Sequence, residues 1–235
     1  MAKKRKNSNY VTEKTERARI EKQRQQKIEK RNRILKPVLI AVGIAILMAA
    51  LIVTLVLVFG DPDKRLSDVN DGFKVTHHAS IEVKDYGTIH LELYGEEAPK
   101  TVENFVKLAN SGYYNGTDFH RIIEGFMAQG GDGKGTDSIK GEFSSNNVEN
   151  GILHVRGAIS MARTAADKNS VSDQFFIMHE DAEHLDGDYA AFGMVTDGIA
   201  VIDKICEDAE PTDNNGSIAA GRRPIITSIS IHAAH

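Results

Sequence analysis

The chain has 235 residues, of which 41% are hydrophobic, enough for one sizeable domain with additional segments. Its single cysteine, Cys206, excludes an internal disulfide framework, so packing must stabilise the fold. The net charge of −4 is unevenly distributed, because residues 1–36 carry 14 Lys and Arg against four Glu, or +10, which leaves −14 for the remainder. The two parts of the chain therefore meet different surroundings.

An apolar run occupies residues 37–60, where no residue is charged and only Thr54 has a polar side chain. A helix over its 22 central residues would be roughly 33 Å long, which matches a hydrocarbon core of about 30 Å. A cleaved signal peptide is the alternative, but its apolar region is usually about 7–15 residues long and ends in a small-residue cleavage site. We therefore expect a transmembrane helix at 37–60.

The two flanks of this run differ in charge. The N-terminal flank contains Lys27, Lys30, Arg31, Arg33 and Lys36, whereas Asp61 and Asp63 follow the run. The positive-inside rule places residues 1–36 in the cytoplasm as a basic segment and everything after Asp61 outside it. Beside a membrane span, the basic segment is more simply a determinant of topology than a nucleic-acid arm, so we expect no nucleic-acid partner.

Residues 61–72 are polar and are interpreted as a linker, and a domain is expected over 73–235. Apolar and polar residues alternate over 80–84 and 88–93, which predicts a β-hairpin. Pro99 suits the first position of a helix that carries apolar residues at helical spacing and closes at Gly112. A second helix is predicted over 199–206. Further strands are predicted at 119–123, 126–129, 155–162, 174–178, 191–195 and 225–232.

Many short strands with two helices predict a mainly β domain, built as a barrel whose ends the helices close. Three motifs in a fixed order make the prediction of this fold more specific. The first is Phe119-His120-Arg121-Ile122-Ile123-Glu124-Gly125-Phe126-Met127-Ala128-Gln129-Gly130-Gly131-Asp132. The second runs from Gly157-Ala158-Ile159-Ser160-Met161-Ala162 to Ser172-Asp173-Gln174-Phe175-Phe176-Ile177, and the third from Leu185-Asp186-Gly187 to Ala191-Phe192-Gly193.

In this order the motifs resemble those of the cyclophilins, the cyclosporin-binding class of peptidyl-prolyl cis-trans isomerases. The resemblance covers essentially all of 73–235. It implies a closed eight-stranded antiparallel barrel capped by two helices, and an enzyme that accelerates rotation about X-Pro bonds. No metal or organic cofactor is implied, and the implied partners are proline-containing polypeptides.

Isomerisation needs no bond to be broken, but amide resonance sets a barrier of about 18–20 kcal/mol. An acceleration of four decades requires roughly 5.5 kcal/mol. A charge-assisted hydrogen bond contributes about 1.5–3 kcal/mol, and more where water is excluded. Arg121 occupies the family's catalytic position, so we expect it to donate to the twisted prolyl amide. The alternative is an arginine merely paired with Glu124 or Asp132.

The resemblance also implies substrate-binding residues. The expected proline pocket is formed by Phe126, Met127, Phe176 and Leu185. Groove positions are matched by His120, Gln129, Ala162 and Gln174, although Gln174 could instead be a buried amide that holds two strands together.

Three further positions, Arg163, His184 and Tyr189, are assigned to the groove but differ from the best-known eukaryotic members. His184 replaces the tryptophan that contacts cyclosporin, and the chain has no tryptophan, so weak or no cyclosporin binding is expected. Tyr189 replaces a histidine and can still donate a hydrogen bond. Arg163 replaces an asparagine, as in bacterial relatives, and could favour acidic substrates or be paired on the surface.

Other chemistries find less support. The segment 179–184 has one residue too many between its histidines for a zinc-protease helix, and Ser160 has no evident base partner in the sequence. The sequence thus predicts a bacterial, membrane-anchored, extracytoplasmic isomerase that assists the folding of exported or surface proteins. The alternative is a non-catalytic cyclophilin-like module that binds proline-containing partners.

Overall fold

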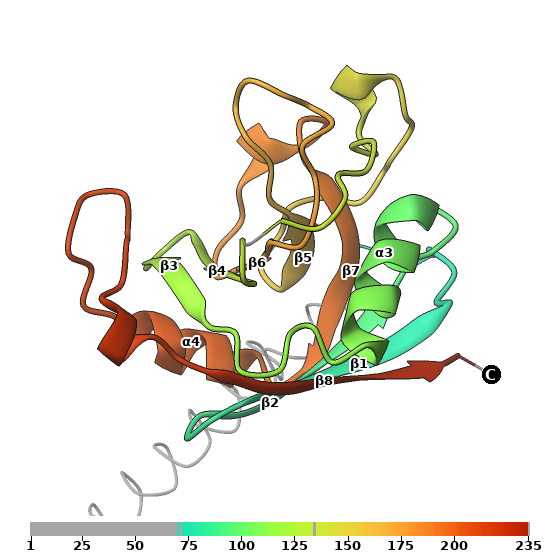
Figure 1. The fold of residues 1–235 in the computed structure, drawn as a ribbon. Coiled ribbons are helices and arrows are strands. Elements are labelled where there is room, and N and C mark those ends of the chain that lie inside the picture. Colours follow the sequence, from blue (N-terminus) through green and yellow to red (C-terminus); the bar gives the residue numbers. More distant parts are fainter. Residues whose placement is uncertain (1–69, 71, 134, 235) are drawn as a thin grey trace, which may run out of the picture. The chain divides into compact units, whose positions relative to one another are not determined.

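A computed structural model describes residues 70, 72–133 and 135–234, all within the compact unit Asp61–His235. Two helices, α3 (Pro99–Asn110) and α4 (Ile199–Glu207), accompany eight strands (Figure 1). The strands are β1 (His77–Val83), β2 (Gly87–Leu93), β3 (Phe119–Ile123), β4 (Met127–Gly130), β5 (Ala158–Met161), β6 (Phe175–Met178), β7 (Ala190–Asp197) and β8 (Ile226–Ala233). Three short 3₁₀ turns, η1 (Ser144–Asn146), η2 (Glu183–Leu185) and η3 (Ala220–Arg222), complete the described elements.

The predicted hairpin is present as β1 and β2. Inward positions of β1, such as Ile81, are buried, while outward positions such as Glu82 are exposed, as the alternation predicted. Gly87, the first residue of β2 after the connecting turn, has a φ of 124°, a backbone conformation that residues with a side chain rarely adopt. The turn therefore fixes the register in which Ile81 lies opposite Ile89.

All eight strands belong to one antiparallel sheet with the order β3-β4-β6-β5-β7-β2-β1-β8. The predicted closed barrel is wrong, because the sheet curls into a half-barrel whose edge strands β3 and β8 form no ladder with each other. An isolated bridge between Asp118 and Ile225 and a hydrogen bond from the Gly116 N–H to the Ile226 carbonyl join the segment before β3 to the start of β8.

The chemistry of the chain before β8 explains why the sheet stays open. Antiparallel pairing beyond the Asp118–Ile225 bridge would require the residues before Ile225 to face β3. Pro224 has no N–H to donate, although its carbonyl accepts from Phe119, and residues 220–222 form η3. The free edge of β3 is instead met by the loop 211–218, through a bridge between Arg121 and Ser217.

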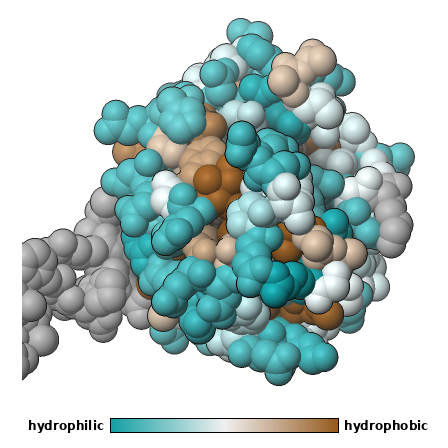
Figure 2. Space-filling view, turned by 90° about the vertical axis from the view of Figure 1, so that its left-hand side faces the viewer, coloured by the Kyte–Doolittle hydropathy of each residue, from teal (hydrophilic) through white to brown (hydrophobic). Residues whose placement is uncertain are grey.

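The core lies inside the half-barrel and is closed by the helices. Helix α3 packs against β7 and β8, and α4 packs against β2, β3 and β4. The two predicted helices are confirmed, with Ile199, Ile202 and Cys206 of α4 buried as expected. Among the described residues, Leu153 and Ile225 are the large apolar side chains that are exposed. Figure 2 accordingly shows brown apolar surface mainly in recesses between hydrophilic residues.

The predicted strand bounds differ most at β1, which begins at His77 and not at 80, and at β5. Strand β5 begins at Ala158 and not at 155, because Val155 and Arg156 belong to a turn. The predicted transmembrane helix at 37–60, the basic segment 1–36 and most of the 61–72 linker lie outside the described residues. Within residues 70, 72–133 and 135–234, neither helix is long and apolar enough to cross a membrane.

Candidate active site

A cavity of about 460 Å³ lies beside β3, β4 and β6, and we call it the groove. The structure brings ten of the twelve predicted site residues together there. They are Arg121, Phe126, Met127, Gln129, Ala162, Arg163, Phe176, His184, Leu185 and Tyr189. The eleventh lining residue, Asp188, was not predicted. The other two predicted residues, His120 and Gln174, line a neighbouring cavity.

Arg121 is held from two sides. Its Nε donates to the carbonyl oxygen of Asn215 over 2.8 Å, and one terminal nitrogen donates to Oε1 of Gln129 over 3.3 Å. Burial lowers the pKa of Arg121, while Tyr189 and Asp213 oppose the shift, and a guanidinium remains charged at neutral pH. A fixed, partly desolvated cation therefore faces the groove.

The loop 211–218 supports this arginine, and sequence reasoning did not find it. Oδ1 of Asp213 accepts the backbone N–H groups of Asn215 and Ser217, each over 3.0 Å. These bonds lower the pKa of Asp213, with Ser217 as the main cause. The loop joins β3 where the N–H of Ile122 donates to the Gly216 carbonyl. The sequence Asp-Asn-Asn-Gly at 213–216 is typical of a turn, so the turn itself could have been predicted. The contact with Arg121 could not, because it is made by a backbone carbonyl, which every residue type has.

Gly216 of this loop lies close against β3. Its φ is +84°, and a Cβ there would lie 2.5 Å from the Ile122 carbonyl oxygen. We expect Gly216→Ala to destabilise the domain by about 1–3 kcal/mol and to lower isomerase activity several-fold, because Asn215 must move. Thermal unfolding and X-Pro kinetics measure both effects. Gly221→Ala is the matched control, since nothing lies near its Cβ; equal behaviour of the two variants would contradict the supporting role of the loop.

The apolar walls of the groove come from β4, β6, η2 and the β3–β4 turn. Met127 and Phe176 are almost fully buried, and Phe126 stacks on His184 with ring centroids 5.8 Å apart. Phe126 is held by its own backbone, whose carbonyl accepts the N–H of His179, while Nδ1 of His179 accepts the N–H of Gly125. Apolar and aromatic side chains thus surround a space beside the cation.

Arg163 and Tyr189 form the opposite side. The guanidinium of Arg163 lies 4.5 Å from the centre of the Tyr189 ring and 5.4 Å from that of Phe143, both cation–π distances. Its Nε donates to the Asp188 carbonyl. Arg163 was expected either to favour acidic substrates at the groove or to be paired on the surface. It lies at the groove and has no carboxylate partner among the described residues.

Gln129 and Gln174 separate the groove from the cavity next to it. Nε2 of Gln129 donates to Oε1 of Gln174 over 2.8 Å, so an amide pair continues the chain of hydrogen bonds from Arg121. Gln174 therefore does hold neighbouring segments together, since Gln129 belongs to β4 and Gln174 precedes β6. It is only partly buried.

Comparison with known proteins decides the family. The family model described as "Cyclophilin type peptidyl-prolyl cis-trans isomerase/CLD" matches residues 78–231. The chain belongs to the cyclophilin family. As a cyclophilin-type peptidyl-prolyl cis-trans isomerase it is an enzyme, which agrees with the resemblance found in its motifs.

Relatives of this cyclophilin come from distant organisms. A peptidyl-prolyl cis-trans isomerase of Helicobacter pylori is 41% identical over 149 residues, which cover 62% of the chain and 90% of the relative. The isomerase CYP18-1 of Arabidopsis thaliana is 39% identical over 164 residues, which cover 68% of the chain and 96% of the relative. A cyclophilin of Cryptosporidium parvum, solved in the presence of the dipeptide Ala-Pro, is 30% identical with a TM-score of 0.57. The match covers 67% of the chain and 99% of that structure.

Behind the groove the cyclophilin contains a buried Ser–His–Asp arrangement, so the expectation that Ser160 lacks a base partner is wrong. Nδ1 of His154 lies 2.9 Å from Oδ1 of Asp186, and Nε2 lies 3.0 Å from Oγ of Ser160. Ser160 is 0% exposed, which leaves a substrate no access to its hydroxyl. The His154 ring instead stacks on Phe176 at 6.1 Å, so the three residues support a wall of the groove.

Burial lowers the pKa of His154 despite Asp186, so its imidazole is neutral in the folded cyclophilin and donates a hydrogen bond to the carboxylate. The unfolded chain takes up a proton near pH 6.5, whereas the folded chain does so only at lower pH. We therefore expect stability to fall as pH drops from about 7 to 5. Denaturant unfolding across this range should show a shallower fall in His154→Gln and an unchanged fall in His90→Gln, an exposed histidine. Parallel curves for parent and His154→Gln would contradict this assignment.

Proposed function

We propose that the groove isomerises X-Pro bonds and that Arg121 is its catalytic residue. The proline ring lies among Phe126, Met127, Phe176 and Leu185, and the guanidinium donates to the prolyl amide as it twists and loses conjugation. The observation that carries this proposal is a guanidinium fixed by Asn215 and Gln129 beside apolar walls. Such a donor needs no general base and no reorganisation during rotation.

The remaining groove residues fit roles in binding. Gln129 accepts a hydrogen bond from Arg121, and the N–H of Ala162 donates to the Gln174 carbonyl; both residues contact the client backbone. Arg163, His184 and Tyr189 contact the client's side chains. The cyclophilin solved with Ala-Pro supports a small proline-containing ligand for this class of domain. Weak cyclosporin binding is part of the proposal, because an imidazole at His184 offers less apolar area than an indole.

We further propose that the enzyme is bacterial, is anchored by a transmembrane helix at 37–60 and acts outside the cytoplasm on exported or surface proteins. Support comes from the uncharged apolar run and from the +10 and −14 charges of the two parts of the chain. In this arrangement, residues 1–36 are cytoplasmic, 61–72 form a linker and 73–235 form the isomerase domain.

The activity is tested by the cis-to-trans rate of X-Pro peptides with several residues before proline. The purified full-length chain is expected to accelerate isomerisation, and excess of an unlabelled proline peptide should compete. No acceleration by a folded chain with any peptide would contradict the catalytic proposal and leave the non-catalytic proline-binding module. No contact in the described residues favours that alternative.

The location is tested by protease treatment of intact cells that lack an outer permeability barrier. The isomerase domain is expected to be removed from the membrane fraction, while an epitope placed in residues 1–36 stays protected. Digestion of both parts only after lysis would contradict the extracytoplasmic location and leave the enzymatic proposal intact.

A further inference from the structure

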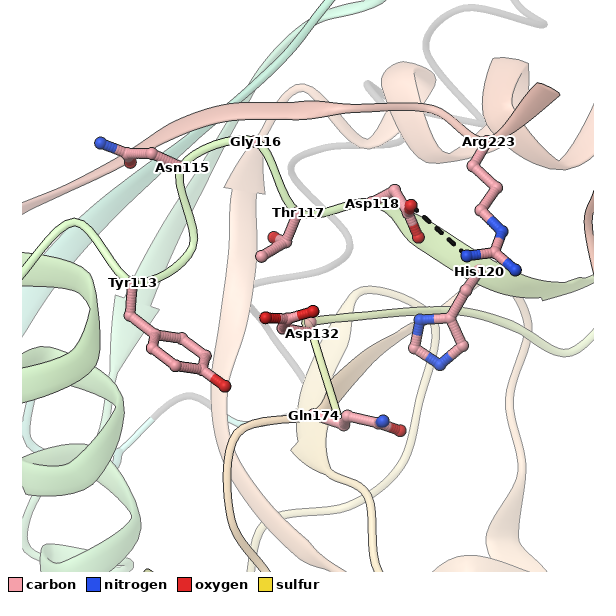
Figure 3. A pocket seen from close by; sticks show the side chains of 10 residues that line it. Tyr113, Asn115, Gly116, Thr117, Asp118, His120, Asp132, Gln174 and Arg223 are labelled. Atoms are coloured by element: carbon pink, nitrogen blue, oxygen red, sulfur yellow. Dashed lines mark ion pairs between the residues drawn. The ribbon is translucent and has the colours of Figure 1, made fainter. Parts of the chain in front are cut away.

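A second cavity, of about 520 Å³, lies next to the groove, and we call it the flanking cavity. Its volume falls within the usual range of about 300–1,000 Å³ for ligand sites. Figure 3 shows side chains converging on it from four separate segments, with His120 and Gln174 on one side and Tyr113 and Thr117 on the other. The remaining lining residues are Asn115, Gly116, Asp118, Gly131, Asp132 and Arg223.

The same three strands build both cavities. On β3, His120 lines the flanking cavity and Arg121 lines the groove. The neighbouring strands repeat this division. At β4, Gln129 lines the groove and Gly131, just after the strand, lines the flanking cavity. At β6, Phe176 lines the groove and Gln174, just before the strand, lines the flanking cavity. The two cavities are therefore side by side, separated by the hydrogen-bonded amides of Gln129 and Gln174.

Several walls of the flanking cavity are fixed. The Tyr113 hydroxyl donates to Asp173 over 3.0 Å, and the same oxygen of this buried carboxylate accepts the N–H of Gly133. Arg223 donates from Nε to the Ile218 carbonyl and approaches Asp118 at 3.5 Å. The cavity is thus shaped before any ligand arrives, which lowers the entropic cost of binding.

Two polar side chains in this cavity are available to a ligand. Neither the imidazole of His120 nor Nε2 of Gln174 has a hydrogen-bond partner among the described residues. Figure 3 shows the His120 ring directed into the cavity, with the Gln174 amide beside it. An imidazole and a carboxamide can serve both the N–H and C=O groups of a peptide. Aromatic surface is limited to Tyr113, so the cavity suits polar residues and not a proline ring.

We propose that the flanking cavity is an extended subsite that receives two or three polar residues of the client polypeptide on one side of the proline. The inference rests on the proposed function of the groove and adds a requirement for client length and polarity. An extended chain advances about 3.3 Å per residue, so a few residues carry it past the amide pair into the cavity. The enzyme then distinguishes prolines in open, polar segments from isolated X-Pro units.

The test compares peptides of three kinds with the purified full-length chain. A short blocked X-Pro peptide is the reference, and it is extended by three residues on either side with Ser-Asn-Gly or with Leu-Leu-Leu. Extension by the polar sequence on one side is expected to raise kcat/KM about five- to tenfold, the size of one or two added hydrogen bonds. The apolar extension should change it less than about twofold.

A matched pair of variants assigns the gain to this cavity. Thr117 lines the flanking cavity but not the groove, so Thr117→Tyr fills the cavity and Thr117→Ser keeps both its space and the hydroxyl that donates to the Tyr114 carbonyl. Both variants should isomerise the short peptide like the parent, and only Thr117→Tyr should lose the gain. Should Thr117→Tyr not fold, a nitroxide at the end of the polar extension should broaden the amide signals of Gly116 and Gly131 in the parent.

Each outcome bears on a different claim. Activity on the short peptide with no gain on extension, an equal gain in Thr117→Tyr, or broadening only around Arg163 would overturn the extended subsite and leave the isomerase intact. Absence of activity on every peptide would overturn the function proposed for the groove and, with it, the subsite.

Discussion

Arg121→Ala is expected to lower kcat/KM for X-Pro isomerisation roughly 10- to 150-fold, which corresponds to about 1.5–3 kcal/mol for a hydrogen bond from a charged donor. The loss should lie mostly in kcat, because the bond strengthens as the amide twists, while the apolar walls still hold the proline ring. The measurement is the cis-to-trans rate at several peptide concentrations, after circular dichroism has shown that the variant is folded.

Arg121→Lys is the matched control for charge. A lysine keeps the cation, but it lacks the fork through which Nε bonds Asn215 while a terminal nitrogen bonds Gln129. It should recover only a small part of the lost activity. Full activity in Arg121→Lys would show that a nearby positive charge suffices, and full activity in Arg121→Ala would remove Arg121 from the mechanism.

Much of the architecture could be predicted because it follows local rules. Alternation defined β1 and β2, since Ile81 and Ile89 face the core while their neighbours face water. Apolar spacing and Pro99 defined α3 in the same way. Most groove residues could be found because they lie in or beside the three ordered motifs, and strand pairing brings Arg121 opposite Gln129.

The parts that could not be predicted depend on contacts between distant segments. Whether a barrel closes depends on the last pair of strands, and here Pro224 and η3 end the pairing of β3 with the chain before β8. The support of Arg121 comes from the Asn215 carbonyl, 94 residues away, and every residue type has a carbonyl. The bond between His154 and Ser160 required knowledge that a turn brings β5 back past His154.

The same long-range contacts connect the core to the groove. Asp186 and Ser160 fix the His154 ring, this ring stacks on Phe176, and Phe176 forms a groove wall. Phe175, the neighbour of Phe176, points to the other face of the sheet and is fully buried. The strand β6 therefore divides its side chains between the groove and the core, so loss of packing on one face can reach the other.

Phe105→Ala tests the core side of this connection and is expected to destabilise the domain by about 3–5 kcal/mol. Phe105 is 0% exposed, and its ring centroid lies 5.1–5.6 Å from those of Tyr114, Phe175 and Phe192. Truncation removes all three ring contacts and leaves a cavity between α3 and the sheet. Since domains are stable by only about 5–15 kcal/mol, the melting temperature should fall by roughly 6–20 °C.

Phe73→Ala is the matched control, because Phe73 is half-buried and, among the described residues, its ring pairs with one other aromatic ring, that of Tyr94. We expect it to cost about 1 kcal/mol, in line with partial burial and one ring pair. Thermal unfolding followed by near-ultraviolet circular dichroism distinguishes the two variants. If Phe105→Ala lost no more stability than Phe73→Ala, the aromatic cluster could not be the centre of the core. If Phe105→Ala lost much stability but kept a normal kcat below its melting temperature, β6 would hold Phe176 in place even without the packing of Phe105.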